Sequence, residues 1–190
     1  MIRTGQTIEN PVTGERLVFR RTAADTKGEL VIVETFVQPH GFVAAAHVHP
    51  SQEERFEVLR GTVGFRIGRD EIVAGPGQRI TVPAGTAHRF WNAGEEEAHF
   101  VCEIRPALRF EQLIETMFGL ASDGKTNRKG MPNPLRLAVI ADAHFDTVRL
   151  PFPPAFLQRV GLALGAPAGR LLGYEATYAP SDAEPAAAVV

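Results

Sequence analysis

The sequence predicts an all-β barrel or sandwich followed by a helical extension, and three observations support this fold class. Short runs rich in Val, Ile, Phe and Thr recur between about residues 15 and 106, where glycine and proline separate them. After Pro106 the apolar spacing changes to three and four residues, which is the helical period. With 190 residues, the chain is long enough for one ordinary domain and few more.

The strands are predicted from apolar runs of four to eight residues. Turn signals lie between the runs, for example at Asn10–Gly14 and Gly75–Gly77. Short strands at this spacing are typical of a closed or sandwiched β structure. The predicted strands are Arg16–Arg20, Leu30–Val37, Phe56–Leu59, Val63–Ile67, Ile80–Val82 and His99–Ile104.

The helices are predicted from the second half of the chain. Apolar residues at i, i+3, i+4, i+7 and i+8 from Phe110 to Phe118 form one face of an amphipathic helix. Leu135–Ala143 and Pro154–Leu164 are two further short helical segments, and proline is favoured in the first turn of the second. We therefore expect a barrel domain at 1–106 and a helical extension at 107–180 that packs on the barrel. The Ala-rich segment 181–190 is expected to be a disordered tail.

Composition excludes several classes of partner. Lys and Arg number 20 against 22 Asp and Glu, a net charge of −2 that favours no nucleic-acid partner. No run approaches the ~18 apolar residues of a membrane span, and Met1–Asn10 has no apolar signal-peptide core. Cys102 is the single cysteine, so no intrachain disulfide forms. These features together predict a cytoplasmic protein.

Histidine spacing identifies the candidate site. His47 and His49 are two residues apart, so in a strand their side chains share one face with Cα atoms about 6.5 Å apart. Val43 and Ala45 lie on the same face. Pro50 and the two residues after it favour a reversal, which would bring a glutamate beside the two imidazoles.

A third histidine completes the set. His88 begins a strand after a turn at Pro83–Gly85. Three imidazoles and one carboxylate suit Fe(II), Mn(II), Ni(II), Co(II), Cu(II) or Zn(II), whereas Ca(II) prefers oxygen ligands alone. Four protein ligands leave one or two positions free on a five- or six-coordinate ion, where a small chelating molecule can bind.

The two segments resemble, at every fixed position, the paired motifs of the cupin superfamily. The matching residues are Gly41, His47, His49, Glu54 and Gly61, then Gly77, Pro83, Gly85, His88 and Asn92. The resemblance covers residues 30–106. The C-terminal segments Gly124–Pro134 and Gly173–Tyr174 are similar to those of a group of small bacterial single-domain cupins. The resemblance implies a double-stranded β-helix, a jelly-roll-like closed barrel. It also implies one divalent metal ion per chain, held inside the barrel by His47, His49, Glu54 and His88.

Glu53 and Glu54 compete for the carboxylate position, and period-two alternation favours Glu54. Glu54 shares a face with Phe56 and Val58, whereas Glu53 shares one with charged residues. Because a barrel interior takes the apolar face, Glu54 is expected to point inward. The predicted pocket wall consists of Val43, Ala45, Phe56, Val58 and Phe90.

The leading functional hypothesis is a metal-dependent enzyme of the dioxygenase type. Its substrate would be a small, partly apolar molecule with an oxygen-based chelating group, and Glu54 would serve as ligand and, when released, as base. A metal-dependent isomerase or decarboxylase fits the same ligands. A non-catalytic barrel that binds or senses a small molecule is the alternative from another class. We also expect a homodimer, formed through Arg16–Val37 and the helices after Phe110, because jelly-roll barrels leave strand edges to cover.

Overall fold

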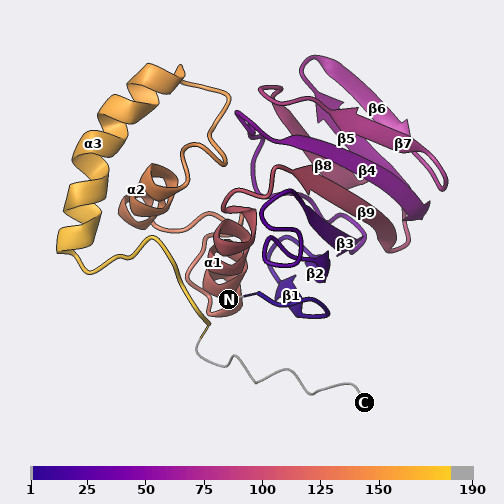
Figure 1. Ribbon diagram of the computed structural model, residues 1–190, viewed down its shortest axis with the longest axis horizontal. Helices are drawn as coiled ribbons and strands as arrows, with labels where there is room; N and C mark the ends of the chain where they lie inside the picture. Colours follow the sequence, from indigo (N-terminus) through magenta and orange to yellow (C-terminus); the bar gives the residue numbers. More distant parts are fainter. Residues whose placement is uncertain (1, 181–190) are drawn as a thin grey trace.

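The protein folds as an antiparallel β structure with C-terminal helices, as the sequence predicts (Figure 1). The computed structural model describes residues 2–180, so the expected tail at 181–190 lies outside the described residues. Within the described chain, nine strands precede three helices. In Figure 1 the strands gather on one side, and α2 and α3 lie on the other, beyond α1.

Two sheets make up the β structure. Neighbouring strands in both sheets are antiparallel. The larger sheet has the order β1 (Thr7–Asn10), β2 (Glu15–Arg21), β3 (Val31–Val37), β9 (Ala98–Arg105), β4 (Glu53–Arg60) and β7 (Arg79–Val82). The smaller sheet has the order β6 (Asp70–Ala74), β5 (Val63–Ile67) and β8 (His88–Asn92).

The core lies between the sheets because the central strands alternate. Every second residue of β3 and β9 is buried, which is the pattern of strands with one face against a core. Aromatic rings join the layers. Between centroids, the Phe56 ring of β4 lies 5.1 Å from Phe65 of β5, and the Phe100 ring of β9 lies 5.3 Å from Phe90 of β8. Such aromatic contacts add specific geometry to the apolar burial.

The structure adds two strands that the sequence pattern does not predict. β1 has only four residues and is partly exposed, and the solvent-facing β6 carries Asp70 and Glu71. Both are edge strands, where apolar alternation is weak because one side contacts water. The β5–β6 hairpin turns at Gly68, whose φ of 60° suits a tight connection between strands.

Residues 41–49 differ from the expected strand. This segment pairs through isolated bridges, Phe42 with Trp91 and His47 with His88, instead of a continuous ladder. Its three consecutive alanines, Ala44 to Ala46, have low strand propensity, and Pro50 cannot donate to a ladder. The segment is nevertheless extended enough to bring the two histidines of its end to the barrel.

The extension consists of α1 (Phe110–Ser122), α2 (Pro134–Ala143) and α3 (Ala155–Leu171). α1 places Phe110 and Phe118 in the barrel core. α2 begins at a cap in which the Asn133 side chain accepts a hydrogen bond from the Leu135 N–H, at 2.9 Å. α1 therefore packs on the barrel, and α2 packs on α1 through Ile140, which contacts Leu113 and Leu120.

α3 extends seven residues beyond the predicted end at Leu164. Glycines and Pro167 weaken the helical pattern in that part of the sequence. The structure explains the glycine: a Cβ on Gly169 would lie 2.5 Å from the Leu135 carbonyl oxygen, so Gly169 lets α3 approach α2 closely. Packing against α2 therefore stabilises a helix that intrinsic propensity does not favour.

Candidate functional site

Four side chains that the motifs single out lie together at one end of the barrel. One potential ligand atom from each of His47, His49, Glu54 and His88 lies within 4.8 Å of the others. Backbone pairing sets two of them side by side, because the His47 N–H donates to the His88 carbonyl at 3.0 Å and the His88 N–H donates back at 2.9 Å. The two imidazole centroids are consequently 4.3 Å apart.

Glu54, and not Glu53, belongs to this cluster. Glu54 is 5% exposed and faces the histidines, whereas the Glu53 carboxylate lies at the surface and accepts a hydrogen bond from Arg55 at 2.7 Å. The alternation argument thus selects the inward residue. β4 supplies Glu54 from its second position, directly after the turn that follows His49.

The arrangement of donor atoms fits a cation. Glu54 Oε1 lies 3.5 Å from His49 Nε2, and Glu54 Oε2 lies 2.6 Å from His88 Nε2. The second pair lacks hydrogen-bond geometry, so both of these buried atoms have no hydrogen-bond partner. Buried polar atoms are normally satisfied, and a shared metal ion would satisfy both. The four residues are therefore positioned to hold an ion.

Each imidazole is oriented through its other nitrogen. Nδ1 of His47 donates to the Ala45 carbonyl and Nδ1 of His88 to the Thr86 carbonyl, both at 2.9 Å. Nδ1 of His49 faces two acceptors, the Gln52 side-chain oxygen and the Thr147 carbonyl. Because carbonyl oxygens only accept, they hold the proton on Nδ1 and leave the Nε2 lone pair directed at the cluster. This is the usual outer arrangement around metal-binding histidines.

Gln52 orients His49. Its side-chain nitrogen donates to the carbonyls of Pro106, at 2.8 Å, and Ala107, at 3.0 Å. Those two bonds turn the Gln52 oxygen toward His49 Nδ1, 3.0 Å away. Gln52 is 1% exposed, so solvent offers no competing partner. The sequence analysis did not identify this residue, since a glutamine in a turn carries no distinctive signal.

The extension provides the second acceptor for His49. The Thr147 carbonyl lies 2.7 Å from His49 Nδ1. Two backbone bonds hold the segment in place: Val48 N–H donates to the Arg149 carbonyl at 2.8 Å, and Arg149 N–H donates to the Val48 carbonyl at 3.0 Å. The segment between α2 and α3 is thus paired directly with the histidine segment.

The protonation states of His47 and Glu54 suit metal ligation. Desolvation, assisted by the neighbouring imidazoles, lowers the pKa of His47 to about 3, so this ring is neutral near pH 7. Burial alone would raise the pKa of Glu54, but the three imidazoles outweigh it and lower that pKa to about 2. Burial opposes protonation of His88, yet the adjacent Glu54 carboxylate raises the pKa of His88 overall.

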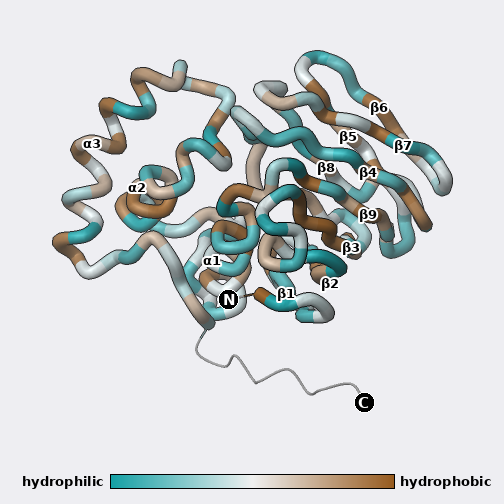
Figure 2. Tube along the Cα trace, in the orientation of Figure 1, coloured by the Kyte–Doolittle hydropathy of each residue, from teal (hydrophilic) through white to brown (hydrophobic). Residues whose placement is uncertain are grey.

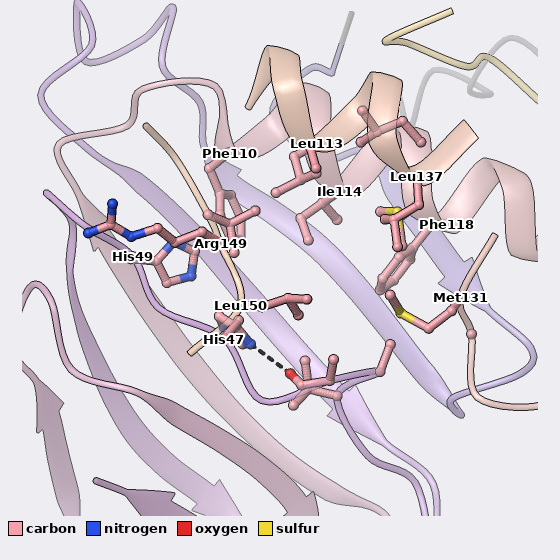
Figure 3. A pocket seen from close by; sticks show the side chains of 18 of the residues that line it. His47, His49, Phe110, Leu113, Ile114, Phe118, Met131, Leu137, Arg149 and Leu150 are labelled. Carbon is pink, nitrogen blue, oxygen red and sulfur yellow. Dashed lines mark hydrogen bonds between the residues drawn. The ribbon is translucent and has the colours of Figure 1, made fainter. Parts of the chain in front are cut away.

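A cavity of about 500 Å³ opens over the cluster (Figure 3). Four of the five residues predicted for the pocket wall line it: Val43, Ala45, Phe56 and Phe90. The fifth, Val58, is not among the residues that line the cavity. Val58 is fully buried in the barrel core, because it lies one step deeper along β4 than Phe56.

The helical extension forms much of the cavity wall. Figure 3 shows His47 and His49 at one end and Phe118, Leu137 and Met131 at the other. Apolar side chains of α1, among them Leu113 and Ile114, point into the space between. The residues predicted for the pocket wall all lie in the barrel. Helix periodicity identifies the apolar face of a helix but not the surface that this face will cover.

Two charged residues of the cavity wall were also not predicted from the sequence. Arg149 lines the cavity beside His49 and forms no ion pair within residues 2–180. Glu15 lines it from β2 and is 7% exposed, with one hydrogen bond, accepted from the Thr13 hydroxyl at 2.7 Å. Alternation could have revealed Glu15, since it shares the inward face of β2 with Leu17 and Phe19.

Burial raises the pKa of Glu15 to about 7, and the Thr13 hydrogen bond offsets this only in part. Because the folded pKa exceeds the unfolded value, the folded state holds the proton more tightly. Stability is therefore full below about pH 4.5 and falls as the pH rises to about 7.

We predict that Glu15→Gln removes this loss. Relative to wild type, the variant should gain about 3 kcal/mol of unfolding free energy between pH 4 and pH 8, an order-of-magnitude figure from about 1.4 kcal/mol per pKa unit. Urea unfolding at a series of pH values measures it. Glu95→Gln, in an exposed turn, is the matched control. Parallel curves for wild type and Glu15→Gln would show that Glu15 does not titrate in this way.

Within the described residues, no helix is both long and apolar enough to cross a membrane.

Comparison with known proteins identifies sequences and structures that are similar to this chain. The family model described as Cupin domain matches residues 33–103. The probable oxidoreductase virH of Hypocrea virens is 28% identical over 152 residues, which cover 73% of this chain and 68% of the relative. Two solved structures also align with the chain. A cupin-superfamily sugar phosphate isomerase from Silicibacter pomeroyi has 21% identity and a TM-score of 0.44, over 50% of this chain and 62% of that one.

A predicted oxalate decarboxylase from Thermotoga maritima aligns with 17% identity and a TM-score of 0.49, over 56% of this chain and 98% of that one. The chain spans about three fifths of the Silicibacter structure. The family match at residues 33–103 includes β4, β8 and all four residues of the histidine and glutamate cluster. The family match and the motif spacing together show that residues 33–103 form a cupin domain.

Proposed function

We propose that the protein is a metal-dependent oxidoreductase of the dioxygenase type, acting on a small, largely apolar molecule with an oxygen-based chelating group. The observation that carries this proposal is that three members of the His₃Glu cluster, His47, His49 and Glu54, line a cavity of about 500 Å³. A pocket of this size with apolar walls and one polar focus is typical of a small-molecule site. Similarity to a probable oxidoreductase over 73% of the chain supports the reaction class.

His47, His49, Glu54 and His88 would hold one divalent transition metal ion. Nitrogen and oxygen donors in this ratio suit Fe, Mn, Ni, Co, Cu or Zn. The bound ion would supply Lewis-acid polarisation of a chelating oxygen and, for a redox-active metal, electron transfer. The protein's contribution is the fixed orientation of the ligands, which the Nδ1 hydrogen bonds provide.

The remaining residues would bind the substrate and exclude water. Phe56, Phe90 and Phe110 surround the approach to the cluster with apolar surface. Arg149 would pair with an acidic group that lies beside the chelating oxygen. Glu54 would act as a ligand while it contacts the imidazoles, because a carboxylate with a pKa of about 2 is a weak base. A role as catalytic base would require its release from those contacts.

We predict that His88→Ala lowers metal affinity strongly and leaves the barrel folded. The barrel has an extensive apolar core, so the ion is not needed to fold it.

Gln52→Leu, which removes one of the two acceptors of His49 Nδ1, should lower the metal affinity about 10- to 100-fold. Metal content after dialysis against a chelator measures the affinity, and circular dichroism measures folding.

His40→Asn is the matched control for these variants, because His40 is exposed and has a φ of 64° that asparagine tolerates. It should retain the metal of the wild type. Equal retention in His88→Ala would exclude the proposed ligand set. Loss of secondary structure in that variant would assign the ion a structural role instead.

The reaction is tested with oxygen uptake by the metal-loaded protein. Candidate substrates are β-dicarbonyls, hydroxy acids and catechols with apolar substituents. We expect substrate-dependent consumption of oxygen, with both oxygen atoms recovered in the product by isotope labelling. Isomerised product or released carbon dioxide without oxygen uptake would assign an isomerase or a decarboxylase. Tight binding with no conversion would identify a binding or sensing protein.

We further propose that the protein forms a homodimer and that α3 contributes to the contact. Figure 2 shows hydrophobic residues recurring along α3, and several are exposed. They are Phe156 (67%), Leu157 (47%), Val160 (60%), Leu164 (76%) and Leu171 (89%). A continuous apolar stripe of this kind marks an interaction surface, and a second copy offers the same stripe in a two-fold arrangement.

Light scattering should therefore give twice the mass of one chain, which is 20.7 kDa. A Val160→Asp, Leu164→Glu double variant should be monomeric, because it places two unpaired charges in the contact. A matched variant with substitutions at the exposed Arg159 and Arg170 should stay dimeric. A wild-type monomer at micromolar concentration would disprove the dimer, and a dimeric double variant would exclude α3 from the contact.

A further inference from the structure

A small polar patch lies on the sheet wall of the otherwise apolar cavity. It consists of Asn10 on β1, Glu15 on β2 and Thr35 on β3, all of which line the cavity. Asn10 stands directly opposite Glu15 in the β1–β2 register, and Thr35 stands opposite Leu17, one inward position along from Glu15. The three side chains are 4%, 7% and 2% exposed, so the strands hold them together away from bulk water.

The patch has unused hydrogen-bonding capacity. The Asn10 side-chain oxygen accepts bonds from the N–H groups of Val12 and Thr13, but its nitrogen makes no hydrogen bond to residues 2–180. Glu15 Oε2 accepts from the Thr13 hydroxyl, while Oε1 has no partner among the same residues. The Thr35 hydroxyl makes none either within the described chain. Buried polar groups are usually satisfied, so these atoms are available to a ligand in the cavity.

The patch is distant from the histidine cluster. In the sheet register, Glu54 of β4 is paired with Ile104 of β9, and Ile104 is paired with Val31 of β3. Glu15 of β2 is paired with Val37 of β3, which lies six residues beyond Val31 on the same strand. Six residues correspond to about 20 Å of extended chain. The side chains between, including Leu17, Val33 and Phe100, are apolar and line the same cavity.

We propose that Asn10, Glu15 and Thr35 form a distal polar subsite that binds an alcohol or phenol hydroxyl at the far end of an elongated apolar substrate. The placement of the substrate's other end at the histidine cluster rests on the proposed function. A hydroxyl both donates and accepts, and it matches a free Glu15 oxygen and a free Asn10 nitrogen.

Electrostatics favour a neutral group over an ammonium at this subsite. No basic side chain among the described residues forms an ion pair with Glu15, and burial raises its pKa to about 7. Near neutral pH much of the Glu15 population therefore carries a proton. A buried ammonium beside it would lose hydration without a fully charged partner, whereas a hydroxyl loses much less.

Isothermal titration of the full chain tests the subsite. The probes are ω-hydroxy fatty acids of increasing chain length, each paired with the fatty acid that lacks the terminal hydroxyl. At the chain length that spans the cavity, the hydroxy acid should bind about tenfold more tightly, the effect of one or two net hydrogen bonds. ω-Amino acids of the same length should show no such gain.

Variants assign the gain to the patch. Glu15→Leu should abolish the preference for the hydroxyl and leave the plain fatty acid's affinity unchanged, because a buried apolar side chain of similar size replaces the carboxyl. Glu15→Gln, which keeps a donor and an acceptor, should retain part of the preference. Wild type that does not discriminate at any length, or a preference that survives Glu15→Leu, would overturn the subsite.

Metal-loaded and metal-free protein separate this inference from the proposed function. Removing the metal should weaken both members of each pair equally and preserve their ratio. A preserved ratio with unchanged absolute affinities would support the subsite while contradicting metal-anchored binding. A preference seen only for amines would assign the patch to a cationic group and would likewise overturn the proposal.

Discussion

A carboxylate buried among three imidazoles is the constraint on which the rest of the site depends. Taken alone, Glu54 would be costly inside an apolar barrel, because burial disfavours its charge. The histidines offset that cost, and the carboxylate in turn favours a cation between them. Every element around the cluster follows from holding these four groups together: the His47–His88 backbone pair, the inward register of β4 and the carbonyl acceptors behind each ring.

The helices are part of the same construction. The barrel supplies the four polar groups at one of its ends. Here α1 and α2 cover that end with apolar side chains, and the segment after α2 reaches back to His49. The extension therefore serves two physical purposes at once. It lowers the polarity of the space above the cluster, and it fixes the orientation of one imidazole.

Much of the site could be predicted from the sequence because its information is local. The spacing of His47 and His49, and the alternation that separates Glu54 from Glu53, depend only on neighbouring residues in an extended chain. The choice of Glu54 follows from the same alternation. Val58 shows the complementary limit, because it shares the inward face of Phe56 but lies in the barrel core. Alternation gives the face of a residue but not its depth, and the cavity ends at Phe56.

What could not be predicted depends on contacts between distant segments. Gln52 orients His49 only because the carbonyls of Pro106 and Ala107 fix its amide. Glu15 and Arg149 belong to the cavity only because β2 and the segment after α2 meet there. The length of α3 depends on the close approach at Gly169, where packing compensates for poor helix propensity. Local sequence patterns do not predict contacts between segments that lie far apart in the chain.

The acceptor that Thr147 offers to His49 is a main-chain carbonyl, and this has a consequence for evolution and for motion. Any residue at position 147 provides the same oxygen, so substitution there leaves the bond intact, whereas displacement of the segment breaks it. Because the same segment forms part of the cavity wall, displacing it would remove one of the two acceptors of His49 Nδ1 and leave Gln52 as the other. The shape of the cavity wall and the support of the His49 ring therefore depend on the same stretch of main chain.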